Sequence, residues 1–101
     1  MEIKHATNRT FSDLTASGTV IADFWAPWCG PCRMVAPVLE KLAKDYPDIQ
    51  IIKINVDEEV ELATRFRVMS IPTLLLFRDG QLAEKVVGYR DKDALVKDFA
   101  L

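Results

Sequence analysis

The sequence predicts an α/β fold with a mixed sheet, in one domain that spans residues 1–101. Short apolar runs suited to buried strands alternate with stretches in which apolar residues recur at helical spacing. Half of the residues are hydrophobic, which is enough for a packed core in a chain of this length. The turn Asp79-Gly80 separates the last two apolar runs. It predicts a hairpin, so part of the sheet is antiparallel.

The first half of the chain predicts two strands and two helices. Residues 3–6 suit a short strand and residues 10–16 a short helix. Residues 20–25 are apolar almost without a break, as expected of a strand buried on both faces, and Asp23 is the one charge among them. After the two cysteines, apolar side chains recur at helical spacing up to Tyr46, with charged residues between them. This pattern predicts a long amphipathic helix.

The second half predicts three strands and two helices. Residues 49–56 suit a strand, and Asp57 is a candidate N-cap for a short helix that includes Val60 and Phe66. Residues 73–77 form a buried strand, residues 82–88 its hairpin partner, and residues 91–101 a final helix. Strands that alternate with helices in this way predict a central sheet covered on two faces.

Charge and hydropathy exclude several classes of function. Lysine and arginine total 13 against 15 acidic residues, for a net charge of −2, and the basic residues are scattered, so we expect no nucleic-acid partner. No apolar run approaches the roughly 20 residues that a membrane span requires, and no apolar signal segment opens the chain. We therefore expect a cytoplasmic protein with no membrane partner.

The two cysteines, Cys29 and Cys32, are three residues apart at the start of the predicted long helix. Side chains at that spacing share a helix face with Cβ atoms roughly 5–6 Å apart, close to the distance of ~3.8 Å that a disulfide prefers. Closing so short a loop stabilises a fold by only on the order of 2 kcal/mol, so redox chemistry explains the pair better than stability. Two cysteines and one histidine, His5, do not supply four ligands for structural zinc, and we expect no metal.

Position along the helix predicts a different role for each cysteine. Cys29 lies where the strand gives way to the helix, so unpaired backbone N–H groups and the positive end of the helix dipole favour its thiolate. Cys32 lies inside the first turn and is expected to be less exposed. Cys29 is therefore the predicted nucleophile, and Cys32 the thiol that resolves the mixed disulfide.

Asp23 is unusual because a buried carboxylate is costly unless it is paired or protonated, and burial raises the pKa of such a group. Lys53, on a later strand, is its candidate partner. Buried titratable groups gather at functional sites, and we predict that Asp23 acts through water as the base that deprotonates Cys32. The alternative is an aspartate turned to solvent at a strand edge.

Several short motifs together carry a family resemblance. They are Asp23-Phe24-Trp25-Ala26, Trp28-Cys29-Gly30-Pro31-Cys32, Ala36-Pro37, Ile71-Pro72-Thr73 and Val87-Gly88. In identity, order and spacing the sequence resembles the thioredoxin family over almost its whole length. The resemblance implies a thioredoxin fold, with a central mixed five-stranded sheet flanked by four helices. The sequence departs from many members at Pro27, Arg67 and Ser70, and the last two stand where glycines are common.

The resemblance also implies a function. It implies a general protein-disulfide reductase and electron carrier that is recharged by an NADPH-dependent thioredoxin reductase. Its partners would be that reductase and disulfide-containing target proteins, and we expect a monomer without a bound cofactor. Pro31 between the cysteines accompanies a reducing poise in this family, and Asp23 and Lys53 would lie behind the cysteines.

A docking platform around Cys29 follows from the same resemblance. Its members would be Trp28, Gly30, Pro31, Ile71, Pro72 and Gly88. The bond before Pro72 would be cis, and the backbone of Ile71 would pair with a bound peptide as an added strand. Simpler interpretations are an ordinary half-buried aromatic for Trp28 and a strand break for Gly88.

Two other functions stay open at this point. In one, the chain is a scaffold subunit whose dithiol surface docks a partner, and redox turnover is incidental. In the other, it is a specialised reductant for one partner, a possibility raised by the unusual Arg67 and Ser70 beside the platform.

Overall fold

Five strands form one mixed sheet in the order β1-β3-β2-β4-β5. The computed structural model describes residues 3–101, and the strands are β1 (Lys4–His5), β2 (Thr19–Trp25), β3 (Ile49–Asn55), β4 (Thr73–Arg78) and β5 (Gln81–Val87). The pairs β1 with β3 and β2 with β3 are parallel, whereas β2 with β4 and β4 with β5 are antiparallel. The predicted mixed sheet is therefore confirmed.

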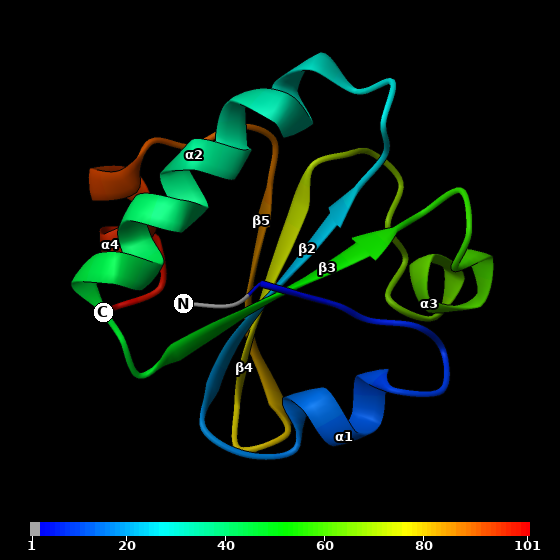
Figure 1. The fold of residues 1–101 in the computed structure, drawn as a ribbon, viewed down its shortest axis with the longest axis horizontal. Helices are drawn as coiled ribbons and strands as arrows, with labels where there is room; N and C mark the ends of the chain where they lie inside the picture. The colour runs from blue at the N-terminus through cyan, green and yellow to red at the C-terminus, as the bar shows by residue number, and fades with distance from the viewer. Residues whose placement is uncertain (1–2) are drawn as a thin grey trace.

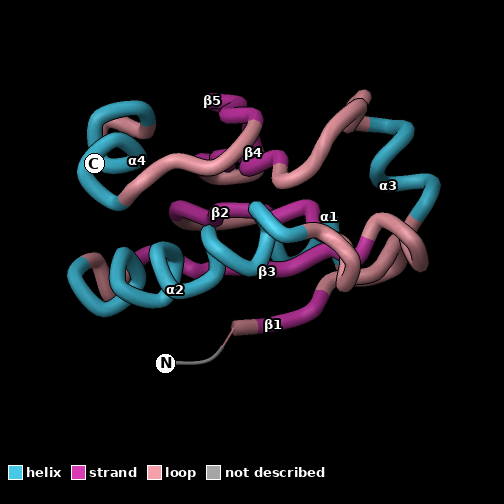
Figure 2. The backbone as a smooth tube through the Cα atoms, turned by 90° about the horizontal axis from the view of Figure 1, so that it is seen from above, coloured by secondary structure: helices cyan, strands magenta, loops and turns pink. Residues whose placement is uncertain are grey.

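Four helices cover this sheet. They are α1 (Phe11–Thr15), α2 (Gly30–Asp45), α3 (Val60–Arg65) and α4 (Lys92–Asp98). Helices α2 and α4 lie on one face, and α1 and α3 lie on the other (Figure 1). Figure 2 shows the strands in their order with α2 and α4 on the left and α3 on the right. Among the described helices, none is long and apolar enough to cross a membrane.

Strand β2 lies between two layers of core because successive side chains point to opposite faces of a strand. Ile21 packs with the core under α2 and α4. Its neighbours Val20 and Ala22 pack instead with the core on the side of α1 and α3. By the same alternation Asp23 shares the face of Ile21, so it lies on the α2 side of the sheet.

Helix α2 begins at the cysteines and runs for 16 residues, through Pro37 without interruption. Cys29 is its N-cap and Pro31 lies in its first turn, where a missing N–H costs nothing. Its buried residues are Cys32, Val35, Leu39, Leu42 and Ala43. The apolar face therefore positions the first turn, and with it the cysteine pair, at the end of β2.

The hairpin between β4 and β5 has the predicted two-residue turn. Asp79 and Gly80 have φ angles of 50° and 84°, as the tight turns that suit twisted strands require. The Asp79 carboxylate also accepts a hydrogen bond from the Gly18 N–H at 2.8 Å. The turn is thus tied to the loop that leads into β2.

Two predicted helix limits differ from the structure. The final helix is shorter than residues 91–101. Asp91 is its N-cap and accepts the Ala94 N–H at 2.9 Å, and the helix ends at Asp98, before Ala100 with its left-handed φ of 53°. The prediction that Asp57 caps α3 is wrong, since the N-cap is Glu59, which makes no side-chain capping bond. Asp57 lies two residues before that position and accepts the indole N–H of Trp28 at 3.0 Å.

Truncation of the α2 core should lower stability. Leu39 is 1% exposed and Met34, on the same helix, is 59% exposed. We expect Leu39→Ala to lower the free energy of unfolding by about 2–5 kcal/mol and Met34→Ala to change it by less than about 0.5 kcal/mol. Equilibrium urea unfolding measures both. Equal losses in the two variants would contradict this assignment of the packed face.

Candidate active site

A disulfide joins Cys29 and Cys32 at the N-terminus of α2, with Cα atoms 5.3 Å apart. The backbone N–H of Cys32 donates to Cys29 Sγ at 3.2 Å. When the bond is reduced, this donor and the positive end of the helix dipole favour a thiolate on Cys29. The local geometry therefore distinguishes the two sulfur atoms.

Burial does not distinguish them. Cys29 is 4% exposed and Cys32 is 3% exposed, so Cys32 is the less exposed residue as expected, but both are buried to almost the same extent. Both pack into one small cluster with Ala26, and partly buried apolar side chains cover it: Trp25, Val56 and Ile71. The two cysteines differ instead in their position along α2: Cys29 is the N-cap, and Cys32 lies in the first turn.

The loop before β4 lies against Cys29. Its Ile71–Pro72 peptide bond is cis, as the resemblance implied. The carbonyl oxygen of Ile71 lies 3.8 Å from Cys29 Sγ. The next carbonyl, that of Pro72, accepts the Gly88 N–H at 2.8 Å. These contacts bring Ile71, Pro72 and Gly88 together beside the disulfide.

Gly88 has a φ of 91°, a conformation that other residues rarely adopt. A Cβ atom placed on Gly88 or on Gly30 would meet no heavy atom within 4 Å. Glycine at position 88 is therefore required by the backbone conformation. Both positions leave open space beside the cysteines.

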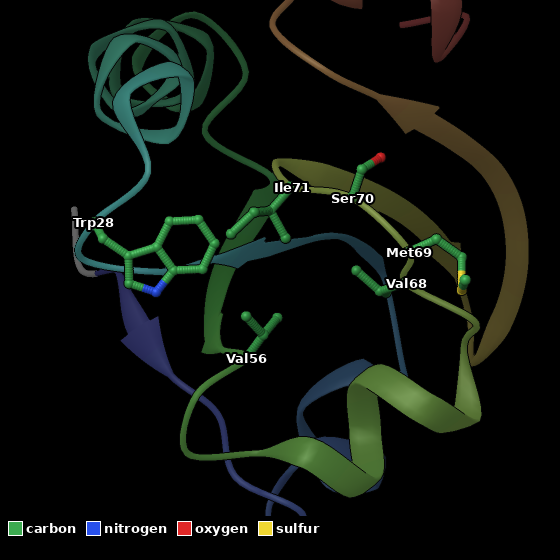
Figure 3. Close-up of a pocket in the computed structure, with 6 residues that line it drawn as sticks. All are labelled: Trp28, Val56, Val68, Met69, Ser70 and Ile71. Carbon is green, nitrogen blue, oxygen red and sulfur yellow. The ribbon is translucent and has the colours of Figure 1, made fainter.

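Trp28 is 67% exposed and held by the hydrogen bond from its indole to Asp57. It forms one side of a pocket of about 360 Å³, and Figure 3 shows the six side chains that line it: Trp28, Val56, Val68, Met69, Ser70 and Ile71. The sequence did not identify Val56, Val68 or Met69 as members of this surface. The available signal was two apolar residues, Val68 and Met69, in the loop just before Ile71.

Asp23 and Lys53 lie side by side on β2 and β3. Lys53 Nζ is 3.8 Å from Asp23 Oδ2, which makes an ion pair longer than a hydrogen bond. The Asp23 side chain is completely buried, whereas that of Lys53 is 19% exposed. The alternative of an aspartate turned to solvent is therefore wrong.

Burial raises the pKa of Asp23 to about 6, and the positive charge of Lys53 opposes that rise only in part. Lys53 Nζ also lies 4.9 Å from the centre of the Trp25 ring, in a cation–π contact. Trp25 itself is partly buried and packs against the cysteine cluster. A carboxyl group with this pKa can exchange a proton near neutral pH.

The departures from the family pattern have a structural explanation at one position. Arg67 follows α3 with a φ of 52°. Its N–H donates to the Thr64 carbonyl at 3.1 Å, and the N–H of Val68 donates to that of Ala63 at 2.8 Å. This is the left-handed helix ending that glycine commonly occupies. Ser70 lines the pocket beside Trp28, and its carbonyl accepts the Thr73 hydroxyl at 2.6 Å.

Comparison with known proteins identifies the family. The Thioredoxin family model matches residues 2–100. This chain belongs to the thioredoxin family. It is 54% identical over 96 residues to a thioredoxin of Bacillus subtilis, covering 94% of this chain and 92% of the relative. It is 50% identical over 98 residues to a thioredoxin of Staphylococcus saprophyticus, covering 96% and 94%.

Solved thioredoxin structures share the fold. Mitochondrial thioredoxin 3 of Saccharomyces cerevisiae, in its oxidised form, matches with a TM-score of 0.89 and 38% identity over 98% of this chain and 95% of that one. A mutant thioredoxin of Halobacterium salinarum matches with a TM-score of 0.88 and 45% identity over 95% and 86%. This thioredoxin-family chain is a protein-disulfide oxidoreductase that uses dithiol–disulfide exchange at Cys29 and Cys32.

The buried carboxyl group should make stability depend on pH. The pKa of Asp23 is about 6 in the folded protein against 3.8 for an ordinary aspartate, so the folded state binds more protons between these values. The wild type should therefore lose stability relative to Asp23→Asn as the pH rises from about 4 to 6. Across this range we expect the difference in stability to shift by about 3 kcal/mol in favour of the variant.

Chemical unfolding of the oxidised proteins across this pH range measures the difference. A matched variant is Lys53→Met, in which the pKa of Asp23 should rise further because the opposing positive charge is gone. A difference between wild type and Asp23→Asn that is constant with pH would contradict the assignment.

Proposed function

We propose that residues 1–101 work as a single domain and a general protein-disulfide reductase, with Cys29 as nucleophile and Cys32 as resolving thiol. Cys29 attacks one sulfur of a target disulfide and forms a mixed disulfide with it. Cys32 then attacks the Cys29 sulfur, which releases the target as a dithiol and leaves the Cys29–Cys32 disulfide. The observation that carries this proposal is the place of Cys29 at the helix cap, with the Cys32 N–H directed at its sulfur.

The target binds on an apolar surface around Cys29 that consists of Trp28, Gly30, Pro31, Ile71, Pro72 and Gly88. Its disulfide-bearing segment lies extended along Ile71 and pairs with the backbone there. Exposure of Trp28 and the short distance from the Ile71 carbonyl to Cys29 Sγ support this placement. Pairing between backbones depends little on the side chains of the bound segment, so the surface accepts many targets.

Asp23 takes the proton of Cys32 through water when the mixed disulfide is resolved. Its position on the α2 side of the sheet and a pKa of about 6 support this role. Lys53 tunes the group, because its charge favours the carboxylate form. A proton acceptor matters here because only a thiolate attacks a disulfide.

An NADPH-dependent thioredoxin reductase reduces the Cys29–Cys32 disulfide. The resulting dithiol then reduces disulfide-containing target proteins. Bacterial thioredoxins at 54% and 50% identity support this cycle. The two thiols carry the electrons, so the chain needs no bound cofactor. We place this monomer in the cytoplasm, where reduced thiols are maintained.

The cysteine roles predict which adduct accumulates. Cys32→Ser should trap a mixed disulfide between Cys29 and a target protein, because no thiol remains to resolve it. Cys29→Ser is the matched control and should form almost none. Non-reducing gels with insulin as the target, followed by release with dithiothreitol, measure the adduct. Equal trapping by both variants would contradict the assignment.

The role of Asp23 predicts a slower second step. In Asp23→Asn, resolution of the mixed disulfide near pH 7 should slow by about 10- to 100-fold, because the proton acceptor is lost. Glu40→Gln removes an exposed carboxylate from α2 and is the control, with no change expected. Rapid mixing followed by acid quench measures the lifetime of the mixed disulfide. An unchanged lifetime in Asp23→Asn would remove the role.

A further inference from the structure

Met69 is the most exposed large hydrophobic residue of residues 3–101, at 92%. It lines the pocket beside Trp28 and also a neighbouring pocket of about 500 Å³ on the α3 side. Figure 3 places Met69 and Trp28 at opposite sides of the first pocket, with Val56 and Ile71 between them in that view. An accessible thioether therefore forms part of an apolar surface next to the active-site disulfide.

The first pocket is continuous with the cysteine site through Ile71. This residue lines the pocket, and its carbonyl oxygen lies 3.8 Å from Cys29 Sγ. A target segment that presents its disulfide to Cys29 and extends past Ile71 therefore reaches Met69. The occupant of the pocket is the disulfide-bearing segment of a target protein.

We propose that Met69 is a site of reversible oxidation by peroxides, and that its sulfoxide weakens the docking of target proteins without impairing the disulfide chemistry. A lone pair of the Met69 sulfur attacks one oxygen of hydrogen peroxide, an S–O bond forms and the O–O bond breaks. The transferred oxygen gives its proton to the departing oxygen, which leaves as water. The sulfur loses two electrons and the peroxide gains them. The effect on docking rests on the function proposed above, whereas the oxidation does not.

The environment explains why a sulfoxide would oppose docking. Most of the pocket lining is apolar, contributed by Trp28, Val56, Val68 and Ile71. The Ser70 hydroxyl, the one side-chain hydroxyl in that lining, points away from Met69 in Figure 3. A sulfoxide oxygen covered by a target segment would lose its water without gaining a partner, which is unfavourable.

Met34 is the natural control. It is 59% exposed on α2 and belongs to neither of the two pockets. Cys29 and Cys32 are nearly buried and already joined in the oxidised protein, so peroxide can be applied to that form. Oxidation of Met69 is thereby separated from oxidation of the thiols.

The first experiment treats the oxidised protein with hydrogen peroxide and follows each methionine by peptide mass spectrometry. We expect Met69 to gain one oxygen faster than Met34, because methionine oxidation follows exposure. Methionine sulfoxide reductases with dithiothreitol should remove it. Oxidation of Met34 at the same rate or faster would overturn Met69 as the preferred site.

The second experiment measures disulfide reduction by the treated protein, with dithiothreitol as electron source. We expect the KM for insulin to rise about fivefold, with kinetics toward the small hydroxyethyl disulfide unchanged. Each protein is compared with its own untreated sample. Met69→Leu should be insensitive to peroxide, and Met34→Leu should keep the full response.

Three results would overturn the proposal. One is an unchanged KM for insulin when Met69 is fully oxidised, and another is an equal loss toward both disulfides. The third is a response in Met69→Leu as large as in the wild type. An untreated protein that reduces neither disulfide would instead overturn the proposed function itself, so the two failures are distinguishable.

Discussion

The burial of residues 20–24 of β2 is the constraint on which the rest of the molecule depends. This strand pairs with β3 on one side and β4 on the other, and a helical layer covers each face. After β2 the chain enters the N-terminus of α2, where the cysteines lie. The same burial encloses Asp23, so the strand that leads to the cysteines also carries the buried carboxyl group that we propose as their proton acceptor.

In the function that we propose, the burial of Asp23 has opposing effects on folding and on chemistry. A carboxylate in the core makes the fold less stable at neutral pH, because the ionised group is poorly solvated there. For the proton transfer that we propose, the same poor solvation is an advantage, since a well-solvated aspartate would bind almost no proton near pH 7. The Lys53 charge sets a compromise between these effects, and natural cores keep such groups chiefly at working sites.

Sequence patterns were sufficient for the fold and for much of the site. Continuous apolar runs and helical spacing identified all five strands and four helices, and the single charge in residues 20–25 pointed to Asp23. Contacts between distant segments were less accessible. Nothing local indicates that Asp57 bonds to Trp28 rather than capping α3, or that Val56 joins Val68 around a pocket. The near-equal burial of the cysteines likewise comes from tertiary packing.

At the end of α3, the side chain of Arg67 can be changed without altering the backbone of the loop beside the pocket. The turn is held by backbone hydrogen bonds from positions 67 and 68, and the Lys85 ammonium donates to the Arg67 carbonyl at 3.3 Å. None of these bonds uses the Arg67 side chain, which is exposed. Backbone hydrogen bonds thus hold the shape of the loop, and the charge at position 67 can change without changing that shape. Evolution or an engineer can retune which partners are attracted without remodelling the cysteine site.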